Sequence, residues 1–315
     1  MSEKASSTRG ASRRSVLAGL VVAAAGAPVL SGLSAGVAHA TSANDTFASN
    51  TELYRHFLGT AETTDGEGVD FARRFKRHDL TDFDKAGTVS YPLTTVLAIH
   101  GGGIEVGTSE LCLGVAGYDP NPDLPSGTPL FTSGPLYDFW MFEGLRTGNQ
   151  TYPDGSAKLN SELHVTSIHC DDHVALSMAA SSLNTLSLHG CTWEQANPGK
   201  TSTPGQDRRG VVVGGRSTAM RNALTTRLKA AGFTIYPGDG DVNGDAVENI
   251  CNRTMTDGGG QLELTRELRD SFFGNPSGAT NRGRTYNEDF KRFVGACRSA
   301  IADVEAPQRT ARLLA

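Results

Sequence analysis

Three features that would indicate other classes of protein are missing from this chain. Beyond the first forty residues, no apolar run is long enough to cross a membrane. No tract of clustered lysine and arginine is present in that part either, so the sequence gives no support for nucleic-acid binding. We find no internal repeat and no linker that divides the chain. What remains is an ordinary globular composition, and 315 residues suffice for one large domain.

The first forty residues are typical of an export signal. Arg13 and Arg14 form a twin-arginine pattern, and a weakly apolar run rich in alanine and glycine follows over 18–37. Ala38-His39-Ala40 is a small-x-small cleavage site. An uncleaved membrane anchor fits poorly, because the run is too weakly apolar to hold a bilayer span. We therefore expect a secreted protein without residues 1–40 and without stable membrane insertion.

Removal of this signal makes the protein more acidic. The formal net charge of the whole chain is −5, and the lost segment carries four basic residues and one acid, which leaves −8. Export permits disulfides, whereas twin-arginine passengers generally fold first in the reducing cytoplasm, so cysteine pairing stays open. The mature chain keeps five cysteines: Cys112, Cys170, Cys191, Cys251 and Cys297.

Short apolar runs alternate with amphipathic segments along most of the mature chain. We expect strands at 94–99, 136–142, 164–168, 184–188, 211–213, 233–236 and 261–264. We expect helices at 109–116, 171–181, 216–231, 265–272 and 287–304. This alternation predicts a single α/β domain with a mixed, mostly parallel sheet flanked by helices.

The domain is expected to occupy residues 49–305, between a polar linker at 41–48 and a C-terminal tail at 306–315. A long loop at 118–135 contains five prolines and is either a lid or an insertion.

Two of the expected strands end in His-Gly. The run 94–99 leads into His100, and the run 184–188 leads into His189. Glycines 101–103 allow a tight turn that can bring the carboxylate of Glu105 back towards His100. Ligands of parallel sheets bind beyond the carboxyl ends of the strands, where both histidines should lie. Two imidazoles and one carboxylate suit a zinc ion that keeps an open position for water.

Other readings of these residues remain open. The segment after 94–99 can also be a polar strand end with a glycine turn. Glu263 stands near the end of another strand and is the best remaining carboxylate for a general base, but its alternation with two leucines also fits a solvated face. A second group of possible metal ligands, which are more often packing or capping residues, comprises His164, His169, Cys170 and His173.

Six short motifs follow one another along the chain: His100-Gly-Gly-Gly-Ile-Glu105, Phe142-Glu-Gly-Leu145, Leu163-His164-Val-Thr-Ser167, Ser187-Leu-His189-Gly190, Asn249-Ile-Cys-Asn-Arg253 and Gly260-Gln-Leu-Glu263. In this order they resemble the poly-γ-glutamate hydrolase family, which consists of zinc peptidases with a carboxypeptidase-like fold. The first motif is quite specific, the later ones are individually weak, and the resemblance covers roughly residues 50–275.

The resemblance implies specific roles for some of these residues. One zinc ion (Zn2+) would be held by His100, Glu105 and His189, and Glu263 would be the catalytic carboxylate. Arg253 and Asn252 would contact a substrate carboxylate. The implied partner is a polyanionic γ-glutamyl polymer, and the implied reaction is hydrolysis of its γ-amide bonds. Two alternatives are a zinc amidase that acts on γ-D-glutamyl bonds of cell-wall peptides and a non-catalytic binding module of the same fold.

The export signal gives a first testable prediction. Replacing Arg13 and Arg14 by lysine keeps the charge but removes the twin-arginine pattern, so the protein should stay in the cytoplasm with its signal attached. N-terminal sequencing of the exported fraction checks this result. A mature protein that still starts at Thr41 outside the cell would contradict the twin-arginine route.

Overall fold

The computed structural model describes residues 45–58, 65–77, 92–238 and 242–310. The expected signal peptide, residues 1–40, lies outside the described residues. No helix in the described part of the chain is long and apolar enough to cross a membrane. All five cysteines are buried and free of disulfides.

Within the described residues, seven strands form one sheet. Their order across the sheet is β1-β3-β2-β4-β7-β5-β6. Parallel pairing joins the central strands β3, β2, β4 and β7, whereas β1 and β5 run antiparallel to their neighbours β3 and β7. The strands are β1 (Phe71–Lys76), β2 (Thr94–Gly102), β3 (Asp138–Gly144), β4 (Asn184–Cys191), β5 (Val211–Gly214), β6 (Ile235–Tyr236) and β7 (Gly260–Thr265).

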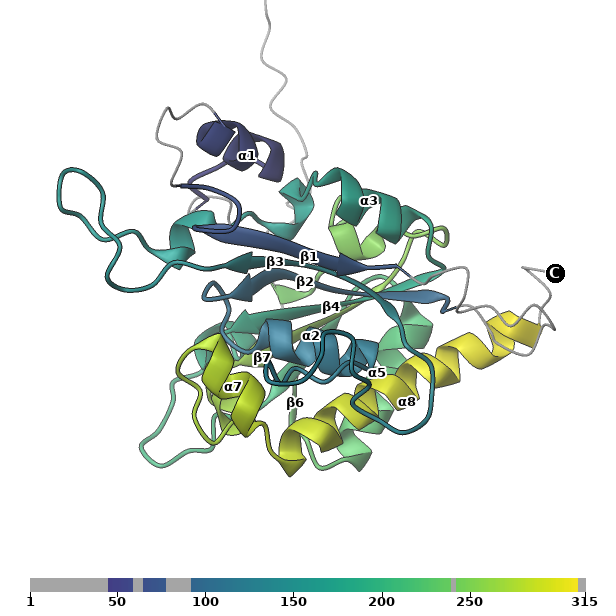
Figure 1. Cartoon of the computed structure of the whole chain (residues 1–315). Coiled ribbons are helices and arrows are strands. Elements are labelled where there is room, and N and C mark those ends of the chain that lie inside the picture. The colour runs from purple at the N-terminus through teal and green to yellow at the C-terminus, as the bar shows by residue number, and fades with distance from the viewer. Residues whose placement is uncertain (1–44, 59–64, 78–91, 239–241, 311–315) are drawn as a thin grey trace, which may run out of the picture. The chain divides into compact units, whose positions relative to one another are not determined.

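Helices cover both faces of this sheet, which confirms the predicted fold class (Figure 1). One face carries α1 (Asn50–Leu58) and α3 (His173–Ala180). The other face carries α2 (Thr108–Ala116), α5 (Thr218–Ala230) and α8 (Glu288–Thr310). Shorter helices are α4 (Trp193–Ala196), α6 (Arg266–Ser271) and α7 (Ala279–Thr285), and single 3₁₀ turns occur at Asn160–Leu163, Ser167–His169 and Ile250–Asn252.

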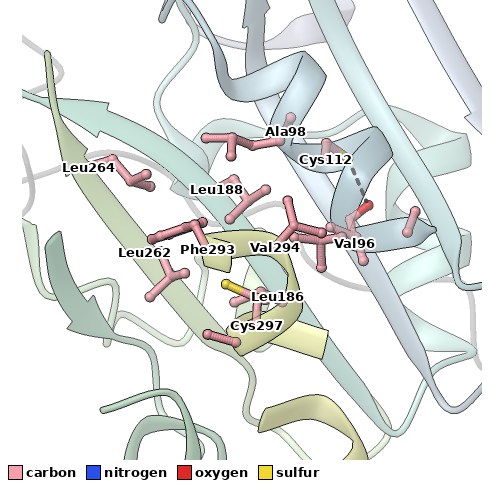
Figure 2. Close-up of a cluster of buried hydrophobic side chains, with 14 of the residues drawn as sticks. Val96, Ala98, Cys112, Leu186, Leu188, Leu262, Leu264, Phe293, Val294 and Cys297 are labelled. Carbon is pink, nitrogen blue, oxygen red and sulfur yellow. Dashed lines mark hydrogen bonds between the residues drawn. The ribbon is translucent and has the colours of Figure 1, made fainter. Parts of the chain in front are cut away.

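The side chains of the central strands alternate between the two faces. Leu186 and Leu188 of β4, with Leu262 and Leu264 of β7, point into the large core beneath α2, α5 and α8 (Figure 2). The residues between them therefore point to the face that carries α3. On that face stand Ser187, His189, Gln261 and Glu263, all of which are buried. The sheet thus has an apolar face and, near its carboxyl edge, a buried polar patch on the opposite face.

Several expected elements differ from those observed. The prediction of a strand at 164–168 is wrong, because the 3₁₀ turn Ser167–His169 begins within this segment. Two of its backbone groups bond to side chains and not to a neighbouring strand: the Val165 carbonyl accepts from His100, and the Thr166 N–H donates to Asp45. The final helix continues to Thr310, past the expected end at 304 and into the expected tail.

Candidate metal centre and active site

The turn between β2 and α2 folds Glu105 back onto His100. Gly102 adopts a left-handed conformation with φ 65°, and a Cβ atom there would collide with the carbonyl of Gly144. The Gly102 N–H donates to the hydroxyl of Ser109 (2.8 Å), and the Glu105 N–H donates to the carbonyl of His100 (2.8 Å). The glycines after His100 are therefore required by the backbone path that returns the Glu105 carboxylate to the strand end.

Two neighbouring parallel strands bring the two histidines together. His100 stands in β2 and His189 in β4, and their Nδ1 atoms are 3.2 Å apart. The Glu105 Oε1 atom lies 2.9 Å from Nδ1 of His100, and Oε2 lies 3.7 Å from Nδ1 of His189. The structure thus places the three sequence-predicted ligands around one point.

A third histidine, His164, is also close to this point. Potential ligand atoms of His100, Glu105 and His164 lie within 4.8 Å of one another. The ring orientations show which of His189 and His164 can bind the same metal ion as His100, because an ion bound by imidazole lies in the plane of the ring. His189 stands at 77° to His100, so the two ring planes cross. His164 lies over His100 with 3.9 Å between the ring centroids and only 30° between the ring planes. An ion in the plane of one ring would therefore lie far from the plane of the other, so the two rings are poorly placed to bind the same ion.

Hydrogen bonds to the distal ring nitrogens leave both Nδ1 atoms free for a cation. Nε2–H of His100 donates to the carbonyl of Val165 (2.9 Å), which accepts only. Nε2 of His189 lies 2.9 Å from the Ser187 hydroxyl and 3.4 Å from the Ser167 hydroxyl. Such outer partners are typical of metal-binding histidines, whose ring orientation and tautomer they set.

The spacing of these atoms fits a tetrahedral zinc site. With ligand bonds of about 2.0–2.2 Å, neighbouring ligand atoms on tetrahedral zinc are about 3.3 Å apart. The contacts of 2.9, 3.2 and 3.7 Å between the three residues scatter around that value. The donor set, the spacing and the ring planes therefore suit one divalent metal ion.

Without a metal, the same contacts are those of an ion pair. Burial disfavours the carboxylate of Glu105, yet the facing His100 ring, with His189 and Arg269, lowers its pKa to about 2. Burial also disfavours a charged His100, yet Glu105 and the Val165 carbonyl raise its pKa. Burial lowers the pKa of His189 to about 3. A metal would take the place of the shared proton on His100.

Glu263 lies directly across from His189 in the pairing of β4 with β7. It is only 8% exposed, so it does not belong to a solvated face. Burial, together with the nearby charge of Glu105, raises its pKa well above the ordinary value, while Arg269 and the amide of Gln261 act in the opposite direction. A raised pKa suits a carboxyl group that takes part in proton transfer.

A cavity of about 550 Å³ opens over these groups. Its volume falls within the range of small-molecule sites. No lysine or arginine is among the described residues that line it. Five acidic residues do line it: Asp45, Glu105, Glu162, Asp245 and Glu263.

The two predicted substrate-binding residues do not line this cavity. Asn252 is fully engaged with the backbone: its oxygen accepts from the N–H groups of Arg216 and Gly259, and its nitrogen donates to two carbonyls. Arg253 donates to the carbonyls of Glu248 (2.8 Å) and Ile168 (3.3 Å). Contact of either residue with a substrate carboxylate stays a prediction.

One residue of the site could not be recognised from its sequence context. Asp45 falls in the stretch expected to be a polar linker, yet its carboxylate is buried and lines the cavity. It bonds to His164 and to the backbone of Thr166, more than a hundred residues further along the chain. No local pattern signals so distant a contact.

Comparison with known proteins identifies the relatives of this chain. A sequence profile described as poly-gamma-glutamate hydrolase matches residues 132–296. The UPF0714 protein YndL of Bacillus subtilis (strain 168) is 31% identical over 201 residues, which are 63% of this chain and 63% of that protein. The SPbeta prophage-derived UPF0714 protein YoqZ of the same organism is 28% identical over 201 residues, which are 63% of this chain and 58% of that protein. The chain thus spans about three fifths of the length of these relatives.

Two solved structures share the fold. A bacteriophage poly-gamma-glutamate hydrolase superposes with a TM-score of 0.59 at 24% identity, covering 84% of this chain and 99% of that chain. A structure described as apo, zinc-free YndL gives a TM-score of 0.58 at 24% identity, covering 84% and 98%. The family profile matches just over half of the chain. The chain therefore belongs to the poly-gamma-glutamate hydrolase family.

Proposed function

We propose that the protein is an exported, zinc-dependent hydrolase that cuts the γ-glutamyl amide bonds of poly-γ-glutamate. The observation that carries the proposal is the convergence of His100, Glu105 and His189 beside the buried carboxyl group of Glu263. The name of the zinc-free YndL structure supports zinc as the ion, and the family profile supports the γ-amide substrate. The signal-like residues 1–40 support export.

The chemistry follows from the two parts of the site. Zinc held by His100, Glu105 and His189 would polarise a carbonyl group and would lower the pKa of water towards ~7. Glu263 takes a proton from the attacking water and passes it to the nitrogen of the leaving amine. Its raised pKa suits this double role, because the same group must accept a proton and then give it up. The glycine turn and the outer hydrogen bonds hold the ligands in place before substrate arrives.

The acidic lining favours a second candidate substrate. Glu162 is already paired with Arg146, and a zinc ion would offset further negative charge, but no described lysine or arginine of the lining would face a polyanion. The γ-D-glutamyl bonds of cell-wall peptides can instead join glutamate to a diamino acid, whose extra ammonium group suits such a lining. We keep this substrate as the alternative to the polymer. A binding module without catalysis is disfavoured, because it has no use for a general base beside an open metal position.

The ligand assignment predicts the behaviour of a histidine variant. His189→Ala should give a folded protein whose zinc affinity is lower by more than about a hundredfold, since loss of an outer-shell partner alone costs ten- to a hundredfold. Atomic emission of the dialysed protein measures the zinc content. The control is His173→Ala, which removes an exposed histidine at the start of α3. Equal zinc in both variants would remove His189 from the ligand set.

The proton-transfer role predicts a different outcome at Glu263. Glu263→Gln keeps the shape of the side chain but removes the proton acceptor, so turnover should fall by at least about a hundredfold. Zinc content and melting temperature should hardly change, because Glu263 is not a ligand. The control is Glu248→Gln, an exposed position on the loop near the cavity. Near-normal turnover by a zinc-loaded Glu263→Gln protein would exclude the base, and loss of zinc would make Glu263 a ligand.

A comparison of substrates separates the candidates. Purified protein should shorten poly-γ-glutamate, leave muropeptides intact and lose activity with a chelator. Added salt should raise the activity on the polymer, because screening weakens its repulsion by the acidic cavity wall. Cleavage of muropeptides alone, slowed by salt, would support the cell-wall alternative. Binding of the polymer without any cleavage would leave only the non-catalytic module.

A further inference from the structure

The chain just after the expected cleavage site reaches into the active-site cavity. Asp45 and Thr46 line the cavity together with the metal-centre residues. The side chain of Asp45 is only 4% exposed. Burying a carboxylate costs free energy of folding unless the group is paired and hydrogen-bonded, so the partners of Asp45 indicate its role.

Asp45 forms hydrogen bonds with two residues of the segment 164–166, which faces the candidate metal centre. Its Oδ1 atom lies 2.6 Å from Nδ1 of His164, and its Oδ2 atom accepts the N–H of Thr166 at 2.7 Å. A carboxylate accepts only, so Nδ1 of His164 carries the hydrogen in this pair. The Val165 carbonyl, between these two points, receives Nε2–H of His100. Asp45 is thus joined through one short segment to a predicted metal ligand.

The face of the His164 ring lies against His100, and the ring also lines the cavity. Its ring stacks on the ring of His100 at 3.9 Å, which restricts the rotation of His100 about its side-chain bonds. Since Nδ1 donates to Asp45, Nε2 carries the lone pair of the neutral ring. Among the described residues Nε2 has no hydrogen-bond partner, and the ring lines the cavity. A half-buried ring with a spare acceptor at the cavity wall suits an amide substrate, which offers one N–H at the bond to be cut.

We propose that Asp45 and His164 complete the active site: His164 contacts the substrate, and Asp45 is a positioning residue. In this arrangement Nε2 of His164 accepts the amide N–H of the bound γ-glutamyl group, and the stacked ring keeps His100 in the plane that binds metal. Asp45 sets the tautomer and the orientation of His164. The inference rests on the proposed hydrolase function, and it makes the start of the mature chain a part of the site.

Two substitutions of His164 separate the two contributions of its ring. His164→Phe keeps a flat ring against His100 but has no nitrogen, so zinc affinity should stay near the wild-type value. The value of kcat/KM on a γ-glutamyl amide should fall roughly five- to tenfold, the effect of one lost hydrogen bond. His164→Ala also removes the stack, so zinc affinity should fall as well. Both are measured on the mature, zinc-loaded protein by competition with a chromogenic chelator and by steady-state kinetics.

Substitutions of Asp45 test the positioning role. Asp45→Ala should lower kcat/KM at least as much as His164→Phe, and Asp45→Asn should recover part of the loss because its amide oxygen can still accept from His164. The control is Asp171→Ala, which removes a carboxylate that accepts the N–H of Thr51 at α1 away from the cavity. It should leave the kinetics unchanged after correction for the folded fraction, measured from the melting curve.

The outcomes of this series decide the proposal. Wild-type kcat/KM in His164→Phe would contradict the substrate contact, and equal zinc affinity of His164→Ala and the wild type would contradict the stacking role. Equal losses in Asp45→Ala and Asp171→Ala would reduce Asp45 to a structural brace and overturn its positioning role. If the wild-type protein cleaves no γ-glutamyl amide, the proposed function fails and the substrate contact with it. The zinc comparison would still test the stack separately.

Discussion

The pairing of β2 with β4 is the contact on which the site depends. Parallel neighbours end at the same edge of the sheet, so two strands that each finish in His-Gly bring their imidazoles together. The 77° between the two rings then lets both Nδ1 lone pairs meet at one point. Glu105 reaches that point only because the glycines after His100 reverse the chain. The candidate metal centre is therefore a consequence of strand register and of one tight turn.

The two faces of the central strands have different tasks. Leucines of β4 and β7 fill the core beneath α2, α5 and α8 and fix the positions of both strands (Figure 2). On the other face, the same strands carry His189 and Glu263 directly opposite each other. Because side chains alternate along a strand, the same strands carry both the apolar packing and the polar groups that line the cavity. Glu263, the proposed base, therefore stands beside a candidate metal ligand without a loop of its own.

Local sequence patterns were sufficient for much of this arrangement. Apolar runs closed by glycine marked β2 and β4, and periodicity marked α5, so the fold class and the meeting of the two histidines followed. The edge strand β1, Phe71–Lys76, was missed because half-exposed charges interrupt its apolar pattern. The short helix α7 was missed for a similar reason, as Ala279–Thr285 has few apolar positions.

Contacts between distant segments could not be predicted in this way. Val165 sits in an apolar run that resembles a strand, but its carbonyl bonds to a ring from β2. Asp45 looks like a linker residue until the fold brings it to His164. Tertiary structure also determines which residues line the cavity. The described lining contains no arginine or lysine, and Arg253 is not part of it. Such features require coordinates because no local pattern encodes them.

The most direct test of the account is a crystal structure of the mature protein with zinc, recorded at the zinc absorption edge. The account predicts one anomalous peak, bonded to Nδ1 of His100, Nδ1 of His189 and the carboxylate of Glu105, each at about 2.0–2.2 Å. His164 should remain stacked on His100 and bonded to Asp45. A peak bonded to His164 in place of His189, or no peak between these residues in zinc-soaked crystals, would contradict the account.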